Sequence, residues 1–167
     1  MRRLYPSWIL LLAVGCSFEA SCGGKKLNID KAKEFIATLL EKETGAKPTV
    51  TCPDSVKIEK DKTFDCTAAF GTNASAKITI KQNDDQGNIT VQSATGILIA
   101  NKLEKQIGEH FGKANNKHVD AACGDRVRPS TAGLEFQCEI KDAAGSTAKV
   151  NVKVKDDSGN VDFALAQ

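Results

Sequence analysis

The sequence predicts an α+β fold of two tandem repeats, each with one helix packed on a three- or four-stranded antiparallel meander and an internal disulfide. Three observations predict it. Similar segments recur in the same order in both halves, offset by 71 residues at the first cysteine of each pair and 72 at the second. In each half the hydrophobic period changes from helical to alternating. Each half also holds one cysteine pair, with spacings of 14 and 15 residues. The repeats span residues 27–94 and 95–167, and units this small bury a limited core.

Residues 1–15 have the features of an export signal. Arg2 and Arg3 precede the apolar run 8–14, which is too short to span a bilayer. Small residues follow and end at Cys16, a pattern that resembles the lipobox of bacterial lipoproteins, where the thiol is lipidated and the chain is cut before it. We therefore expect a lipoprotein signal peptide over 1–15, an acylated Cys16 and a tether over 16–26.

These features predict export to the cell envelope and anchoring, through membrane lipid on Cys16, to the outer face of a bacterial membrane. The match departs from the usual lipobox, because Ala13 stands where leucine is common. Cys22 is an alternative lipidation site, although the nearby Glu19 fits the pattern badly. An ordinary signal peptide cut near Gly15, or a signal anchor, is the alternative to lipidation.

The first repeat begins with an amphipathic helix. Asn28 or Asp30 can cap its start, it runs to about Thr44, and Gly45 ends it. Its apolar residues recur at steps of three and four and form one stripe: Ile29, Ala32, Phe35, Ile36, Leu39 and Leu40.

The second repeat begins with a weaker version of this helix, which we expect Gly112 to close. Its apolar stripe is expected to contain Leu98, Ile99, Leu103, Ile107 and Phe111.

After each helix the apolar residues alternate with polar ones, as at Ile78 and Ile80 in the first repeat and Val150 and Val152 in the second. Strict alternation predicts an antiparallel sheet with one dry and one wet face, and the helix of the same repeat would cover the dry face. Short segments before the first cysteine of each repeat, 49–52 and 119–123, predict a fourth strand.

The cysteines predict disulfides, because an exported protein folds in an oxidising environment. We expect Cys52–Cys66 and Cys123–Cys138, since each repeat can then close its own bridge. Zinc is the alternative ligand of paired cysteines, but the sequence has no C-x-x-C and the first repeat has no histidine. We expect no metal and no cofactor.

An Asp-Asp-x-Gly-Asn segment lies between the last two strands of each repeat, at 84–88 and 156–160. Paired aspartates suggest a calcium loop, but such a loop needs further oxygen ligands at fixed alternate positions, and these are absent. We predict hairpin turns, with Gly87 and Gly159 at positive φ and aspartate side chains bonded to backbone amides.

The charge balance and the absence of catalytic motifs argue against nucleic-acid binding and enzymatic activity. Without residues 1–15 the chain has 21 basic and 21 acidic residues, so it lacks the basic surface of a nucleic-acid binder. It has no nucleophile elbow, zinc-protease motif, P-loop or dinucleotide fingerprint. His110 on the second helix and His118 in a polar loop have no counterpart in the first repeat. We expect no enzymatic activity and no catalytic residue.

The wet sheet faces are the candidate binding surface, and they would form one broad surface if the two sheets joined edge to edge. Such a polar surface suits an envelope protein or a glycan, and the alternative is a purely structural role in the envelope. The candidate residues are Thr79, Lys81, Thr90, Gln92, Gln137, Glu139, Asn151 and Lys153.

The segments 50–56, 63–67 and 84–89 together resemble a family of small domains of unassigned function, found mostly in exported bacterial lipoproteins. The second half keeps Cys123, Phe136, Cys138 and the segment 156–161 but has Gly124 in place of the proline. The resemblance implies lipidation, export and a disulfide within each unit, and it implies no catalytic residues. The layout is also similar in outline to exported inhibitors of β-lactamases, which implies an inhibitor-like, protein-binding use of the sheet faces.

Overall fold

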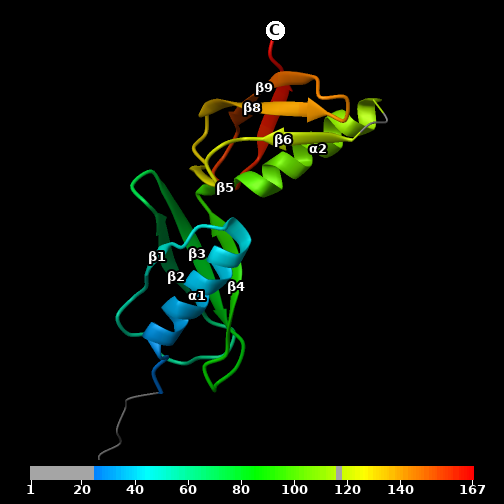
Figure 1. Cartoon of the computed structure of the whole chain (residues 1–167). Coiled ribbons are helices and arrows are strands. Elements are labelled where there is room, and N and C mark those ends of the chain that lie inside the picture. Colours follow the sequence, from blue (N-terminus) through cyan, green and yellow to red (C-terminus); the bar gives the residue numbers. More distant parts are fainter. Residues whose placement is uncertain (1–24, 116–117) are drawn as a thin grey trace, which may run out of the picture.

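The computed structural model describes residues 25–115 and 118–167 (Figure 1). In this part of the chain the fold is α+β, as predicted, with two helices, antiparallel sheets and two disulfides. The expected signal peptide, Cys16 and Cys22 lie outside the described residues.

The first half contains one helix and one four-stranded sheet. Helix α1 (Ile29–Thr44) precedes strands β1 (Thr49–Thr51), β2 (Thr63–Phe70), β3 (Ala74–Gln82) and β4 (Ile89–Thr95). The strands are adjacent in chain order, β1-β2-β3-β4, and each pair is antiparallel. Helix α1 lies across one face of this sheet (Figure 1).

The ends of α1 lie where the sequence predicts them. The Asn28 side chain accepts a hydrogen bond from the backbone N–H of Lys31 at 3.0 Å and caps the N-terminus. At the other end Gly45 has φ 69° and donates its N–H to the Glu41 carbonyl at 2.8 Å. Only glycine adopts this left-handed conformation without steric cost, so the helix ends here.

Residues before α1 already belong to the fold. Lys26 forms an isolated antiparallel bridge with Lys57, and the Leu27 N–H donates to the Val56 carbonyl at 2.9 Å. Ordered contacts therefore begin within the stretch that we expected to be a tether.

The second half contains a four-stranded sheet with the order β10-β9-β8-β6 and a separate two-stranded sheet, β5-β7. All its strand pairs are antiparallel. Its elements are β5 (Ile97–Ile99), α2 (Ala100–Asn115), β6 (Val119–Ala122), β7 (Val127–Pro129), β8 (Glu135–Asp142), β9 (Thr147–Val154) and β10 (Val161–Leu165).

Two expectations for the second helix were wrong. Leu98 and Ile99 belong to strand β5 instead of the helix, because they pair with Arg128 and Val127 of β7. Gly112 lies inside α2, which continues to Asn115. A glycine inside a helix costs only about 1 kcal/mol relative to alanine, so it weakens the helix without ending it.

The buried residues form two core clusters, one with residues of α1 and one with residues of α2, and Ile97 of β5 belongs to the first cluster although it lies in the second half. Ile36 in α1 and Ile107 in α2 are fully buried, and each lies in the core cluster of its own half. The buried residues of the first sheet come from alternate positions, such as Ile78 and Ile80. The predicted alternation of dry and wet faces is therefore present in both sheets.

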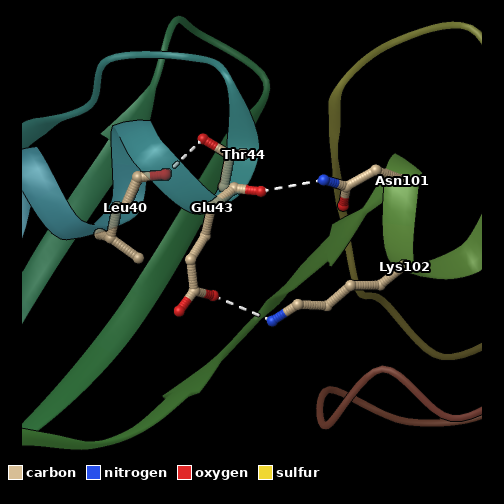
Figure 2. Close-up of polar contacts among 5 residues, drawn as sticks. All are labelled: Leu40, Glu43, Thr44, Asn101 and Lys102. Carbon is tan, nitrogen blue, oxygen red and sulfur yellow. Dashed lines mark hydrogen bonds and ion pairs between the residues drawn. The ribbon is translucent and has the colours of Figure 1, made fainter.

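Two buried polar side chains in the first half have partners. The Thr44 hydroxyl donates to the Leu40 carbonyl at 2.7 Å (Figure 2). The Gln82 amide donates to the Lys57 carbonyl at 3.1 Å and accepts from the Glu59 N–H at 3.1 Å. Burial of these groups is tolerated because their hydrogen bonds are made.

One disulfide closes each half. Cys52 bonds Cys66 and Cys123 bonds Cys138, the within-half pairs that the sequence predicts. In both cases the first cysteine follows a short edge strand and the second lies on the adjacent long strand, β2 or β8.

Gly96 is the only residue between the last strand of the first half and β5. Its N–H donates to the Asp157 carbonyl at 2.7 Å, and its carbonyl accepts from the Ser130 N–H at 2.9 Å. Both partners belong to the second half. The two halves lie end to end, with the C-terminus at the far end from residue 25 (Figure 1).

The second half also bonds the C-terminal end of α1 (Figure 2). Asn101 donates to the Glu43 carbonyl at 3.1 Å, and the Lys102 ammonium lies 2.9 Å from the Glu43 carboxylate. Arg126 donates to the Gly45 carbonyl at 3.3 Å. The last carbonyls of a helix have no partner within it, so these side chains fix the second half against the end of α1.

Candidate binding surfaces

The open face of the second sheet contains a hollow of about 520 Å³. Its floor is the backbone of a row of inward-facing residues, Phe136, Val152 and Phe163, which pair across β8, β9 and β10. The rows of outward-facing residues on either side form its walls, because successive side chains of a strand point to opposite faces. These walls are Glu135, Lys153 and Asp162 on one side and Gln137, Asn151 and Ala164 on the other.

One wall of this hollow is charged. The Lys153 ammonium lies 2.9 Å from the Glu135 carboxylate, and Lys155, just beyond the hollow, lies 3.3 Å from Asp162. All four side chains are largely exposed. Exposed pairs of this kind contribute about 0–1 kcal/mol each, so a ligand could displace them at small cost.

The other wall is neutral. The Gln137 amide nitrogen donates to the Asn151 oxygen at 2.8 Å. The Gln137 oxygen and the Asn151 nitrogen then remain as an acceptor and a donor, the pair of groups that an amide or a hydroxyl ligand can bond. Ala164 beside them has a short side chain, so the hollow is shallow-walled at that end.

The open face of the first sheet is occupied by its own hydrogen bonds and ion pairs. The Thr79 hydroxyl donates to Asp65 at 2.8 Å, and Lys77 lies 3.0 Å from the same carboxylate. Lys81 lies 2.9 Å from Asp61. Hydrogen bonds from Lys77 and Thr79 hold the pKa of Asp65 below its usual value, and Lys81 does the same for Asp61. This face is evenly mixed in charge.

Two further candidate residues of this face lie on the edge strand β4. The Thr90 hydroxyl donates to the Asn83 side chain at 2.7 Å. The register shifts so that Thr79 opposes Ser93 while Ile80 opposes Val91. Gln92 is therefore the extra residue of a bulge in the exposed edge strand.

The two sheets do not form one continuous surface. Each four-stranded sheet is separate in the described part of the chain. Four of the eight candidate residues, Thr79, Lys81, Thr90 and Gln92, lie on the first sheet, and the other four lie on the second. Gln137, Asn151 and Lys153 line the hollow, whereas Glu139 lies outside its lining.

Both Asp-Asp segments form the predicted hairpin turns. Asp84 accepts hydrogen bonds from the N–H groups of Gln86 and Asn88, and Asp156 accepts from those of Ser158 and Asn160. Hydrogen bonds hold the pKa of each aspartate below its usual value. The largest effect comes from the side-chain amide of the turn asparagine, and backbone amides add to it. These carboxylates stabilise the turn itself. In the part of the chain that the structure describes, no group of three His, Cys, Asp or Glu side chains is arranged to hold a metal ion.

The two histidines lie apart. The His110 ring packs edge-on against Phe111 and Phe163, with ring centroids 5.0 and 5.1 Å apart. His118 pairs with Asp120 at 3.0 Å, where each side chain is more than three-quarters exposed. This pair borders an open groove of about 700 Å³ between α2 and β6, whose described lining includes no serine, threonine or cysteine nucleophile.

The helices of the described residues do not resemble membrane spans. Neither α1 nor α2 combines the length and the apolar character that crossing a bilayer requires.

Comparison with known proteins gives one family match. Residues 11–87 match a domain of unknown function (DUF4333). The match begins before the expected lipidation site and ends in the turn between β3 and β4, so it covers most of the first half and none of the second. No curated protein and no solved structure matches the chain.

Proposed function

We propose that this chain is an exported, membrane-anchored lipoprotein, acylated on Cys16, whose folded part is a non-catalytic binding module. The lipobox-like segment before Cys16 supports the anchor, and the match to a domain of unknown function over residues 11–87 includes this segment. The disulfide in each half is consistent with folding in an oxidising compartment.

We further propose that the halves are tandem copies of one unit. The strand order β1-β2-β3-β4 has the same connectivity as β6-β8-β9-β10, and each half has its disulfide at the same place in that order. The bridge between Lys26 and Lys57 also corresponds to the β5–β7 pair, since both join the residues before the helix to the segment after the first cysteine.

The hollow on the second sheet is the observation that carries the binding proposal. It is concave, it has unbonded amide groups on one wall, and its charged wall is held only by exposed ion pairs. It lies in the half that is farther from residue 25 (Figure 1), and therefore farther from the proposed anchor. An envelope protein or a glycan is the partner expected for such a surface. If the partner is a protein, the chain would bind it in the manner of an inhibitor.

Affinity capture tests the binding proposal. The oxidised protein is immobilised and incubated with envelope extract, alongside Gln137→Ala/Asn151→Ala and a matched control, Thr79→Ala/Thr90→Ala. The control removes two polar side chains from the open face of the first sheet. We expect a component captured by the parent and the control and lost with the hollow variant. Equal capture by all three proteins would refute the assignment to the hollow.

Metabolic labelling with a clickable fatty acid tests the anchor. We expect label on the parent and on Cys22→Ser, and none on Cys16→Ser. Label that persists in Cys16→Ser would exclude Cys16 as the acylated residue.

A further inference from the structure

A second hollow lies at the end of the first half where the described chain begins. Its volume is about 450 Å³, and it lies between the start of α1 and the turn that joins β3 to β4. In Figure 1 this end of the molecule is opposite the C-terminus. The described residues that line it are Lys26, Leu27, Asn28, Lys31, Ala32, Phe35, Ile58, Gln86, Gly87, Asn88 and Ile89.

The most exposed apolar residue in the lining of this hollow is Phe35. Phe35 is 43% exposed, and among the described residues only Leu165 is also a large exposed hydrophobic residue. The sequence placed Phe35 in the buried stripe of the helix, but the structure places it at the edge of that stripe. Ile58 and Ile89, both half-buried, line the same hollow and add to the apolar surface beyond the single ring, whereas Leu27, also in the lining, is buried in the core. A contiguous apolar patch on a protein surface indicates an interaction site, whereas a single exposed apolar residue is common and indicates none.

The charged part of the lining is cationic. Lys26 and Lys31 are exposed, and no carboxylate belongs to the described lining. The turn beside the hollow carries two aspartates outside the lining: Asp84 accepts hydrogen bonds from the amides of its own turn, and the exposed Asp85 accepts one from the Lys60 N–H at 3.3 Å. The chain as a whole is almost neutral, so an apolar hollow whose only charged lining residues are lysines is a local departure from its average.

The described chain begins beside this hollow, since Lys26 belongs to its lining. Lys25 is the first described residue, and Cys16 lies nine residues before it. Those nine residues span at most about 30 Å when extended. If Cys16 carries the anchor, the end of the folded protein that holds the hollow is kept within about 30 Å of the membrane.

We propose that this hollow docks on the membrane interface, with Phe35 at the boundary of headgroups and acyl chains and with Lys26 and Lys31 against anionic phospholipid headgroups. The proposal rests on the lipoprotein function proposed above. An exposed apolar residue flanked by lysines is the composition of interfacial membrane contacts, and stable attachment commonly combines an acyl chain with a second signal of this kind.

Tryptophan fluorescence can test this docking, because the described chain contains no tryptophan and Trp8 lies in the expected signal peptide. Phe35→Trp places the probe in the hollow. Leu165→Trp is the matched control, since it replaces the other exposed hydrophobic residue at the far end of the molecule. The full protein, purified as the cell makes it, is reconstituted in vesicles of phosphatidylcholine and phosphatidylglycerol with brominated acyl chains. The parent protein gives the background from any retained Trp8.

We expect the emission of Phe35→Trp to shift to shorter wavelength and to be quenched by brominated lipid, while Leu165→Trp is unaffected. Adding Lys31→Glu should relieve the quenching in vesicles rich in phosphatidylglycerol. Equal quenching of the two tryptophans, in protein that floats with the vesicles, would overturn the docking but leave the anchor intact. Protein that does not float with the vesicles refutes the anchor and the docking together. A blue-shifted but unquenched Phe35→Trp would show that another part of the chain covers the hollow, and would also overturn the proposal.

Discussion

Gly96 offers a sharp test of how the two halves are joined. It has φ +88°, a conformation that side chains with a Cβ rarely adopt. A Cβ at this position would lie 2.8 Å from the Ser75 carbonyl oxygen of the first half. Gly96→Ala therefore combines a conformational cost with a collision against backbone, which cannot move aside as a flexible side chain can.

The two costs can be separated with a matched glycine. Gly145 has φ +89°, and a Cβ there would meet nothing within 4 Å. Gly145→Ala should cost only the left-handed conformation, about 1–2 kcal/mol. Gly96→Ala should cost that amount plus about 1–3 kcal/mol for overpacking. The lower backbone entropy of alanine in the unfolded chain affects both variants equally and cancels in the comparison.

Urea unfolding followed by circular dichroism measures both variants, and thermal unfolding should show the same order. For a chain of this size each kcal/mol lowers the melting temperature by about 2–4 °C. We expect Gly96→Ala to be the less stable variant by about 1–3 kcal/mol. If the two variants agree within about 0.5 kcal/mol, the close contact between Gly96 and the first half is refuted.

Two further predictions concern stability. Replacing both cysteines of either disulfide by alanine should lower the free energy of unfolding by about 3 kcal/mol, because each bridge closes a loop of about 15 residues. Urea unfolding measures this loss, and the control Cys22→Ser should leave the unfolding midpoint unchanged. Hydrogen bonds lower the pKa of Asp84 and Asp156 in the folded protein. Both carboxylates therefore stabilise the fold at pH values above their ordinary pKa of 3.8, and this stabilisation is lost as the pH falls through their lower pKa values in the folded protein. Stability should therefore fall more steeply with acid in the parent than in Asp84→Asn/Asp156→Asn, and parallel pH profiles would contradict this.

Local signals allowed much of the fold to be predicted. Asn28 and Gly45 act through their own side chain or backbone conformation, so the sequence places both ends of α1. Alternation along β8 and β9 reflects the two faces of one strand and is visible without knowledge of the partner strand. The disulfide pairing followed from the repetition of the cysteines.

Features that depend on distant partners could not be predicted in this way. Leu98 and Ile99 continue the apolar pattern of the helix that follows, and only β7, about 30 residues away, makes them a strand. Phe35 has helical spacing that fits a buried stripe, but the structure leaves it exposed, and spacing alone does not say how much of the stripe is covered. The hollow on the second sheet likewise requires the register of three strands, since neighbours across strands line it.

The single-residue connection at Gly96 also limits how far the second half can move relative to the first. A flexible linker would let the second half sample many heights above its attachment point. Here β4 ends at Thr95 and β5 begins at Ile97, while both backbone hydrogen-bonding groups of Gly96 are bonded to the second half. Gly96 therefore moves with the second half, and bending the molecule here would break the hydrogen bonds that Asn101 and Arg126 make with the end of α1. The folded part therefore behaves as a spacer of fixed length, and a partner held on the far sheet would be kept at a set distance and orientation from the end where residue 25 lies.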